Sequence, residues 1–171
     1  MLKERIEKAL NDQVNAEMFS AYLYLSMSSC FSEMNFSGFA QWMKVQAMEE
    51  MSHAMKIYDF IIERGGRVVL TRIDAPETTW ENPLAAFEAA YKHEQYVTGR
   101  INDLVDIAME ERDHATNIFL QWFVSEQVEE EASADEIVQK LKLVGNQGNA
   151  IFMLDRELGS RGFALPSAGT E

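Results

Sequence analysis

Cysteine and proline are scarce in this 171-residue chain, and no apolar run is long enough to cross a bilayer. The single cysteine, Cys30, cannot form an internal disulfide, and the charged start of the chain lacks the apolar centre of a secretory signal. These absences favour the cytoplasm and no membrane partner. Basic residues are scarce too, since 15 Lys and Arg against 28 Asp and Glu leave a net charge of −13. That charge disfavours nucleic acid and favours cations as partners.

Helical periodicity is the strongest pattern that the chain does contain. Its length and its 47% hydrophobic content predict one domain with a substantial core. Apolar residues recur at steps of three and four in four segments, which run from about Lys3 to Glu33, Gly38 to Arg64, Leu84 to Glu111 and His114 to Val144. We place all three prolines outside these segments. Such spacing predicts four helices that cross at shallow angles, as in a bundle.

The lengths of the connections predict the topology. Residues 34–37 and 112–113 are tight links, so the helices on either side of each link are antiparallel. The link from Gly65 to Pro83, about 60 Å long when extended, exceeds a 27-residue helix of about 40 Å. It can therefore run the length of the bundle and make the second and third helices parallel. Gly145 ends the fourth helix, a short fifth helix is predicted around Asn149 to Leu158 (within 147–159), and residues 163–171 form a flexible tail.

Six polar residues interrupt the inner stripes of these helices at positions that would be apolar in a bundle meant only to fold: Glu17, Glu50, His53, Glu94, Gln127 and Glu130. Burying unpaired carboxylates costs several kcal/mol each. Because no Lys or Arg lies on these stripes, a divalent or trivalent cation is the simplest counter-charge. Carboxylates with one imidazole suit iron, manganese or zinc, and the number of ligands suits two ions that share a bridging carboxylate.

Four segments carry a resemblance to a known family, namely NAEMFSAYLYLSM, EEMSHAMK (Glu49 to Lys56), KHEQYVT around Glu94, and FLQWFVSEQVEEE (Phe119 to Glu131). In this order and spacing, the chain resembles a prokaryotic non-haem ferritin over about residues 3–160. The resemblance implies an all-α, ferritin-like four-helix bundle (3–144) with one long crossover, inside a domain spanning 1–162. It also implies iron storage in a homo-oligomeric shell of 24 subunits. Fe(II) would be oxidised by O2 or H2O2 at a diiron ferroxidase centre within each subunit, and ferric oxide mineral would be deposited inside.

The resemblance also implies which residues bind the iron. Glu17, Glu50 and His53 would hold the first iron, with Glu50 bridging. Glu94 and Glu130 would join Glu50 at the second.

Further roles are implied around this pair of irons. Tyr24 would be the nearby redox-active phenol, and Gln127 would lie beside the second iron, either as a ligand or as a supporting group. A third, looser iron site would be formed by Glu49, Glu126 and Glu129, for which a solvated helix face is the plainer alternative.

Two related families remain as alternatives. A rubrerythrin-type diiron peroxidase usually has a second Glu-x-x-His pair, whereas this chain has Gln127-x-x-Glu130. A bacterioferritin binds haem through an interface methionine, and Met48, Met51 and Met55 flank the site here. Glu130, however, stands where that family places a second histidine. We therefore expect no haem. The sequence leaves open whether the shell is octahedral or tetrahedral.

Overall fold

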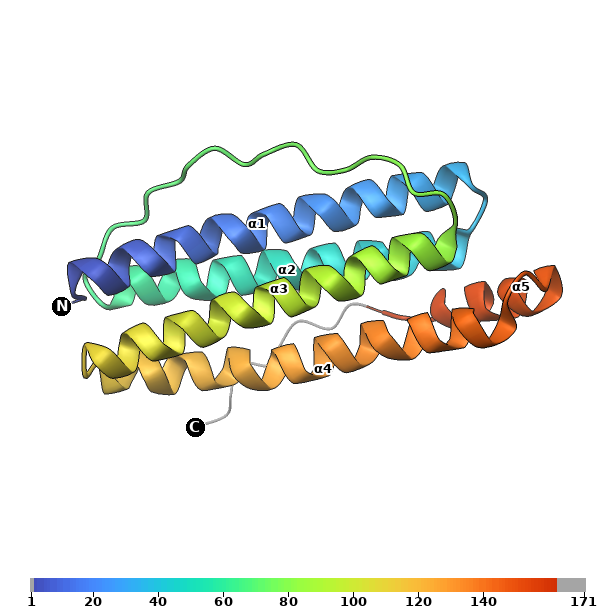
Figure 1. Ribbon diagram of the computed structural model, residues 1–171. Helices are drawn as coiled ribbons and strands as arrows, with labels where there is room; N and C mark the ends of the chain where they lie inside the picture. The colour runs from blue at the N-terminus through green and yellow to red at the C-terminus, as the bar shows by residue number, and fades with distance from the viewer. Residues whose placement is uncertain (1, 163–171) are drawn as a thin grey trace.

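Five helices make up the described part of the chain, residues 2–162 of a computed structural model. They are α1 (Glu4–Glu33), α2 (Ser37–Glu63), α3 (Pro83–Glu110), α4 (His114–Val144) and α5 (Gly148–Leu158). α1 lies beside α2, α3 lies beside α4, and the link between α2 and α3 follows the outside of α1 (Figure 1). The predicted four-helix bundle with one long crossover and a short fifth helix is confirmed. The predicted tail at 163–171 lies outside the described residues.

The predicted helix ends agree with the observed ones to within one residue. One expectation was wrong, because Pro83 is the first residue of α3 and not part of the link before it. A proline at this position loses no helical hydrogen bond, and the side chain of Asn82 caps the helix by accepting from the Ala85 N–H at 2.9 Å. Gly65 follows α2 with a φ of +72°, the left-handed conformation expected at a helix C-terminus. None of the described helices is both long and apolar enough to span a membrane.

The crossover is fastened to α1 by polar side chains on the outer face of that helix. Asn11, Asn15 and Ser26 donate hydrogen bonds of 3.0, 3.0 and 2.6 Å to the backbone carbonyls of Arg67, Arg72 and Glu77. These contacts satisfy backbone groups that have no strand or helix to pair with. They hold the crossover along the whole length of the bundle, so that α3 starts at the end where α2 starts (Figure 1).

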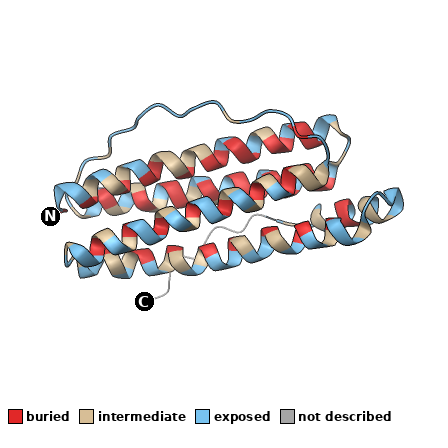
Figure 2. Cartoon of the chain, viewed as in Figure 1, coloured by how far each residue is buried: buried red, intermediate tan, exposed pale blue. Residues whose placement is uncertain are grey.

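Two apolar clusters fill the bundle, one toward each end. One is rich in aromatic residues, including Phe39 and Phe87, whose rings meet edge to face at 5.5 Å. On each long helix, the predicted polar residues fall between the residues of the two clusters. On α1, for example, Val14 belongs to one cluster, Leu23 belongs to the other, and Glu17 lies between them. Buried residues recur along the length of the long helices (Figure 2), and a polar layer interrupts this core midway.

The start of α2 and the end of α5 meet through an unusually close backbone contact. Oδ1 of Asp155 accepts a hydrogen bond of 2.8 Å from the Phe39 N–H, which pairs a donor that the helix itself cannot satisfy. Beside it, a Cβ added to Gly38 would lie 1.6 Å from the Asp155 carbonyl oxygen. Only glycine allows this approach, so Gly38 fixes where α5 docks.

We expect Gly38→Ala to lower the free energy of unfolding by about 1–3 kcal/mol, the usual range for overpacking against atoms that cannot move away. Denaturation in urea measures this. Gly99→Ala is the control, because Gly99 lies in α3 with nothing within 4 Å of the added Cβ. That change should be neutral or should stabilise the helix by about 0.5–1 kcal/mol. Equal stabilities of the two variants would contradict the close contact.

Candidate metal centre

The six predicted polar side chains meet midway along the bundle, and they come from all four long helices. All are buried, with exposed fractions between 1% and 6%: Glu17, Glu50, His53, Glu94, Gln127 and Glu130. Each lies on the face of its helix where the recurring apolar residues predict a core position. The structure therefore brings the predicted cluster into a single layer.

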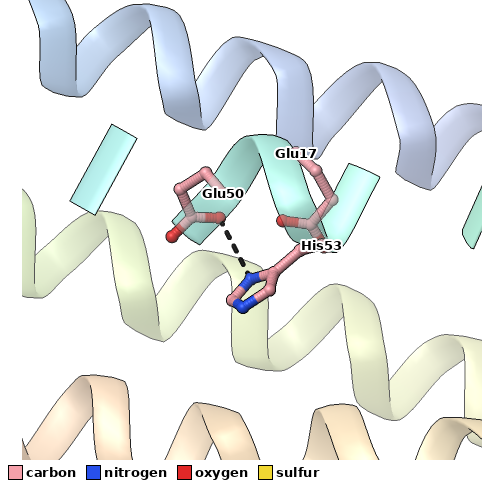
Figure 3. Close-up of side chains that lie close together, drawn as sticks. All are labelled: Glu17, Glu50 and His53. Carbon is pink, nitrogen blue, oxygen red and sulfur yellow. Dashed lines mark ion pairs between the residues drawn. The ribbon is translucent and has the colours of Figure 1, made fainter. Parts of the chain in front are cut away.

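Glu17, Glu50 and His53 form a close group within this layer (Figure 3). One ligand atom from each lies within 4.8 Å of the others, and Nδ1 of His53 is 3.5 Å from Oε2 of Glu50. Glu50 and His53 are one helical turn apart on α2, so both side chains lean toward Glu17 on α1. The Oε2 atoms of Glu17 and Glu50 are buried and have no hydrogen-bond partner. Two bare carboxylate oxygens beside an imidazole fit a metal ion.

Glu94 lies on α3, and its two carboxylate oxygens are both engaged by donors. The hydroxyl of Tyr24 donates to Oε1, and Nε2 of Gln127 donates to Oε2 at 3.3 Å. The same nitrogen of Gln127 lies 3.3 Å from the hydroxyl of Thr98. In this geometry, Tyr24 and Gln127 orient Glu94.

The three carboxylates predicted for a third site do not form one close group of ligand atoms among residues 2–162. Glu126 offers a ligand atom within 4.8 Å of those of His53 and Glu130. Glu49 instead makes an ion pair with Arg161, and Glu129 is exposed. Neither of these two belongs to a close group of ligand atoms among residues 2–162.

Burial decides how readily these carboxyl groups ionise. Removal from water, followed by the charge of Glu50, raises the pKa of Glu17 to about 8. Burial likewise raises the pKa of Glu94 and of Glu130 to about 7, and it raises the pKa of Glu50 well above its ordinary value. Without a cation, the layer therefore holds protons near neutral pH. A metal ion would have to displace them.

The sequence alone assigns no role to Gln13 and Gln46, although both stand on the inner stripes. Each lies four residues before a carboxylate of the layer, and each donates a hydrogen bond to it, Gln13 to Glu17 at 2.8 Å and Gln46 to Glu50 at 3.3 Å. The repeated spacing, Gln-x-x-x-Glu, is the signal that could have found them. These bonds favour the ionised carboxylates and oppose the effect of burial.

Comparison with known proteins places this geometry in a family. The profile of the ferritin-like domain matches residues 7–144. A bacterial non-haem ferritin of Bacteroides fragilis is 50% identical over 161 residues, which cover 94% of this chain and 100% of the relative. A bacterial non-haem ferritin of Campylobacter jejuni is 42% identical over 156 residues, which cover 91% of this chain and 93% of the relative.

A solved structure agrees with these sequence matches. The open pore ferritin of the hyperthermophilic archaeon Archaeoglobus fulgidus is 54% identical and superposes with a TM-score of 0.94, covering 95% of this chain and 100% of that one. Fold, polar layer and sequence all lead to the same assignment, which confirms the predicted resemblance: this chain belongs to the ferritin family.

Proposed function

We propose that this ferritin stores iron by oxidising Fe(II) at the polar layer inside each subunit. Iron storage follows from the family, and the site of oxidation is supported mainly by one observation. The Oε2 atoms of Glu17 and Glu50, which have no hydrogen-bond partner, converge with His53 in a buried layer, and no Lys or Arg is buried among residues 2–162. Hard anionic oxygens favour the more highly charged Fe(III) product over Fe(II). Either O2 or H2O2 would be the oxidant.

Glu50 is the residue that we place between two irons. Its carboxylate lies close to Glu17 and His53, and the charges of Glu94 and Glu130 also act on it. A carboxylate in this position can be shared by both ions. The five ligands that we propose for the pair are Glu17, Glu50, His53, Glu94 and Glu130.

Tyr24 is placed as the neighbouring redox-active phenol. Its ring is buried, and its hydroxyl donates to Glu94. When the ring gives up an electron to O2 that the two irons have only partly reduced, Glu94 can accept the phenolic proton. Gln127 would keep Glu94 in place through its own hydrogen bond.

The proposal includes a shell of 24 copies, as the resemblance to non-haem ferritins implies, and a location in the cytoplasm. Such a shell would give the ferric mineral an enclosed space. Several large apolar side chains on α1 and α2 are between 42% and 52% exposed in the single subunit: Tyr22, Leu25, Met48, Met51 and Met55. Contacts between copies would remove this surface from water.

The metal-free protein should lose stability as the pH rises from about 4.5 to about 8. Glu17 has an ordinary pKa of 4.5 and a pKa of about 8 in the folded chain, so over this range the folded state keeps a proton that the unfolded state has released. The stabilisation present below pH 4.5 is therefore lost as the pH passes 8. Zn2+ should restore it by replacing the proton. Thermal unfolding at several pH values, with and without Zn2+, measures both effects. Glu17→Gln should show a shallower slope, and an unchanged slope would count against this assignment.

Glu17→Ala and His53→Ala should each slow Fe(II) oxidation by at least about 100-fold, because even the loss of a supporting residue costs up to that much. Stopped-flow absorbance of the ferric product, together with the mass of the assembly in solution, checks the effect and the intactness of the shell. His114→Ala is the matched control, since His114 is exposed at the start of α4. Wild-type rates of Fe(II) oxidation in both site variants would contradict the proposed centre.

The double change Glu126→Ala and Glu129→Ala should leave the first round of Fe(II) oxidation intact and slow later rounds by about 10-fold. These acids would take iron onward from the pair and not bind it first. Repeated additions of two Fe(II) per subunit separate the two phases. Asp103→Ala with Asp106→Ala is the control, as these acids have the same spacing on an exposed part of α3. A slowed first round would contradict the onward role.

A further inference from the structure

Two fully buried glutamines contact the carboxylate layer in the same way. Gln13 on α1 and Gln46 on α2 are both 0% exposed, and each precedes a proposed ligand by four residues. Nε2 of Gln13 donates to Oε1 of Glu17 at 2.8 Å. Nε2 of Gln46 donates to Oε1 of Glu50 at 3.3 Å and to Oε2 of Glu130 at 2.6 Å. Each amide nitrogen thus faces the ligands.

Behind each glutamine stands an arginine from a distant part of the chain. Nε of Arg100, on α3, donates to the side-chain oxygen Oε1 of Gln13 at 2.9 Å. Nη1 of Arg161, which follows α5, donates to the side-chain oxygen Oε1 of Gln46 at 2.8 Å. A guanidinium group has donors only, so it holds the amide oxygen on its own side and turns the NH2 group inward. The reversed amide would point its oxygen at an ionised carboxylate.

Both arginines are themselves fixed in place. Arg100 also donates to the backbone carbonyl of Asp12 at 3.0 Å and lies over the ring of Tyr96. Arg161 lies over the ring of Trp42, 4.5 Å from its centroid, and makes an ion pair with Glu49. These contacts hold each guanidinium against a glutamine, and neither guanidinium forms an ion pair with Glu17 or Glu50.

The consequence appears in the carboxylate oxygens. In both Glu17 and Glu50, Oε1 accepts a hydrogen bond from a glutamine, and Oε2 is buried without a hydrogen-bond partner. We propose that Arg100 and Arg161 are positioning residues that act through Gln13 and Gln46, so that Glu17 and Glu50 each present one chosen oxygen to the metal. This inference rests on the proposed iron site. It adds two arginine–glutamine pairs, Arg100 with Gln13 and Arg161 with Gln46, which we call relays.

Cobalt titration of the intact protein tests the relays without relying on catalysis. Anaerobic calorimetry gives the Co2+ affinity, and the visible spectrum of bound Co2+ reports its ligand geometry. Arg100→Met and Gln13→Met should each weaken the tightest Co2+ site by about 10- to 100-fold and alter the spectrum, as expected for groups that orient ligands. The double variant should bind no more weakly than Gln13→Met alone, because the arginine acts through the amide. Arg161→Met with Gln46→Met repeats the cycle on the other relay.

Arg156→Met is the matched control, since Arg156 is exposed on α5 and carries the same charge. Wild-type Co2+ affinity and spectrum in Arg100→Met and Arg161→Met would overturn the inference, and so would full additivity of each arginine with its glutamine. Glu17→Ala distinguishes an error in the proposed iron site from an error in the proposed relays. If it leaves tight Co2+ binding intact, the proposed iron site itself is wrong. If it abolishes that binding while the relay variants bind normally, only the relays are wrong.

Discussion

The removal of several carboxylates from water, in a layer between two apolar clusters, is the constraint on which the rest of this structure depends. Burial and mutual repulsion make the charged layer unfavourable, as the raised pKa values of Glu17, Glu94 and Glu130 show. The layer cannot hold the four helices together by itself. That task falls to the aromatic and aliphatic clusters on either side, which bury enough apolar surface to offset a costly centre.

The docking of α5 on the start of α2 connects one end of the bundle to the carboxylate layer. Gly38 lets α5 approach the start of α2, and Asp155 ties the two helices together through the Phe39 N–H. This docking determines where the chain leaves α5, and so it delivers Arg161 to Gln46. A packing contact far from the layer therefore sets the position of a donor that reaches the layer through one amide.

Local periodicity was enough to predict the helices and the buried polar residues of the layer. An acid such as Glu94 on an apolar stripe is visible in the sequence because its neighbours three and four residues away are apolar. Contacts between distant segments leave no such signal. Nothing in the sequence pairs Arg161 with Glu49 and Gln46, which lie 112 and 115 residues away along the chain. Pro83 was misplaced for another reason, because a proline can equally end a link or begin a helix.

Arg161 shows why an amide between arginine and ligand matters. Where its guanidinium touches a carboxylate directly, at Glu49, the negative charge is already balanced, and a metal ion would have to compete with a permanent cation. Where Gln46 intervenes, the neutral amide orients Glu50 without placing an arginine charge against its carboxylate. One arginine can thus support two carboxylates with different affinities for cations. If iron binds as proposed, a strong site at Glu50 and a weaker one at Glu49 is the order that the proposed oxidation and onward transfer require.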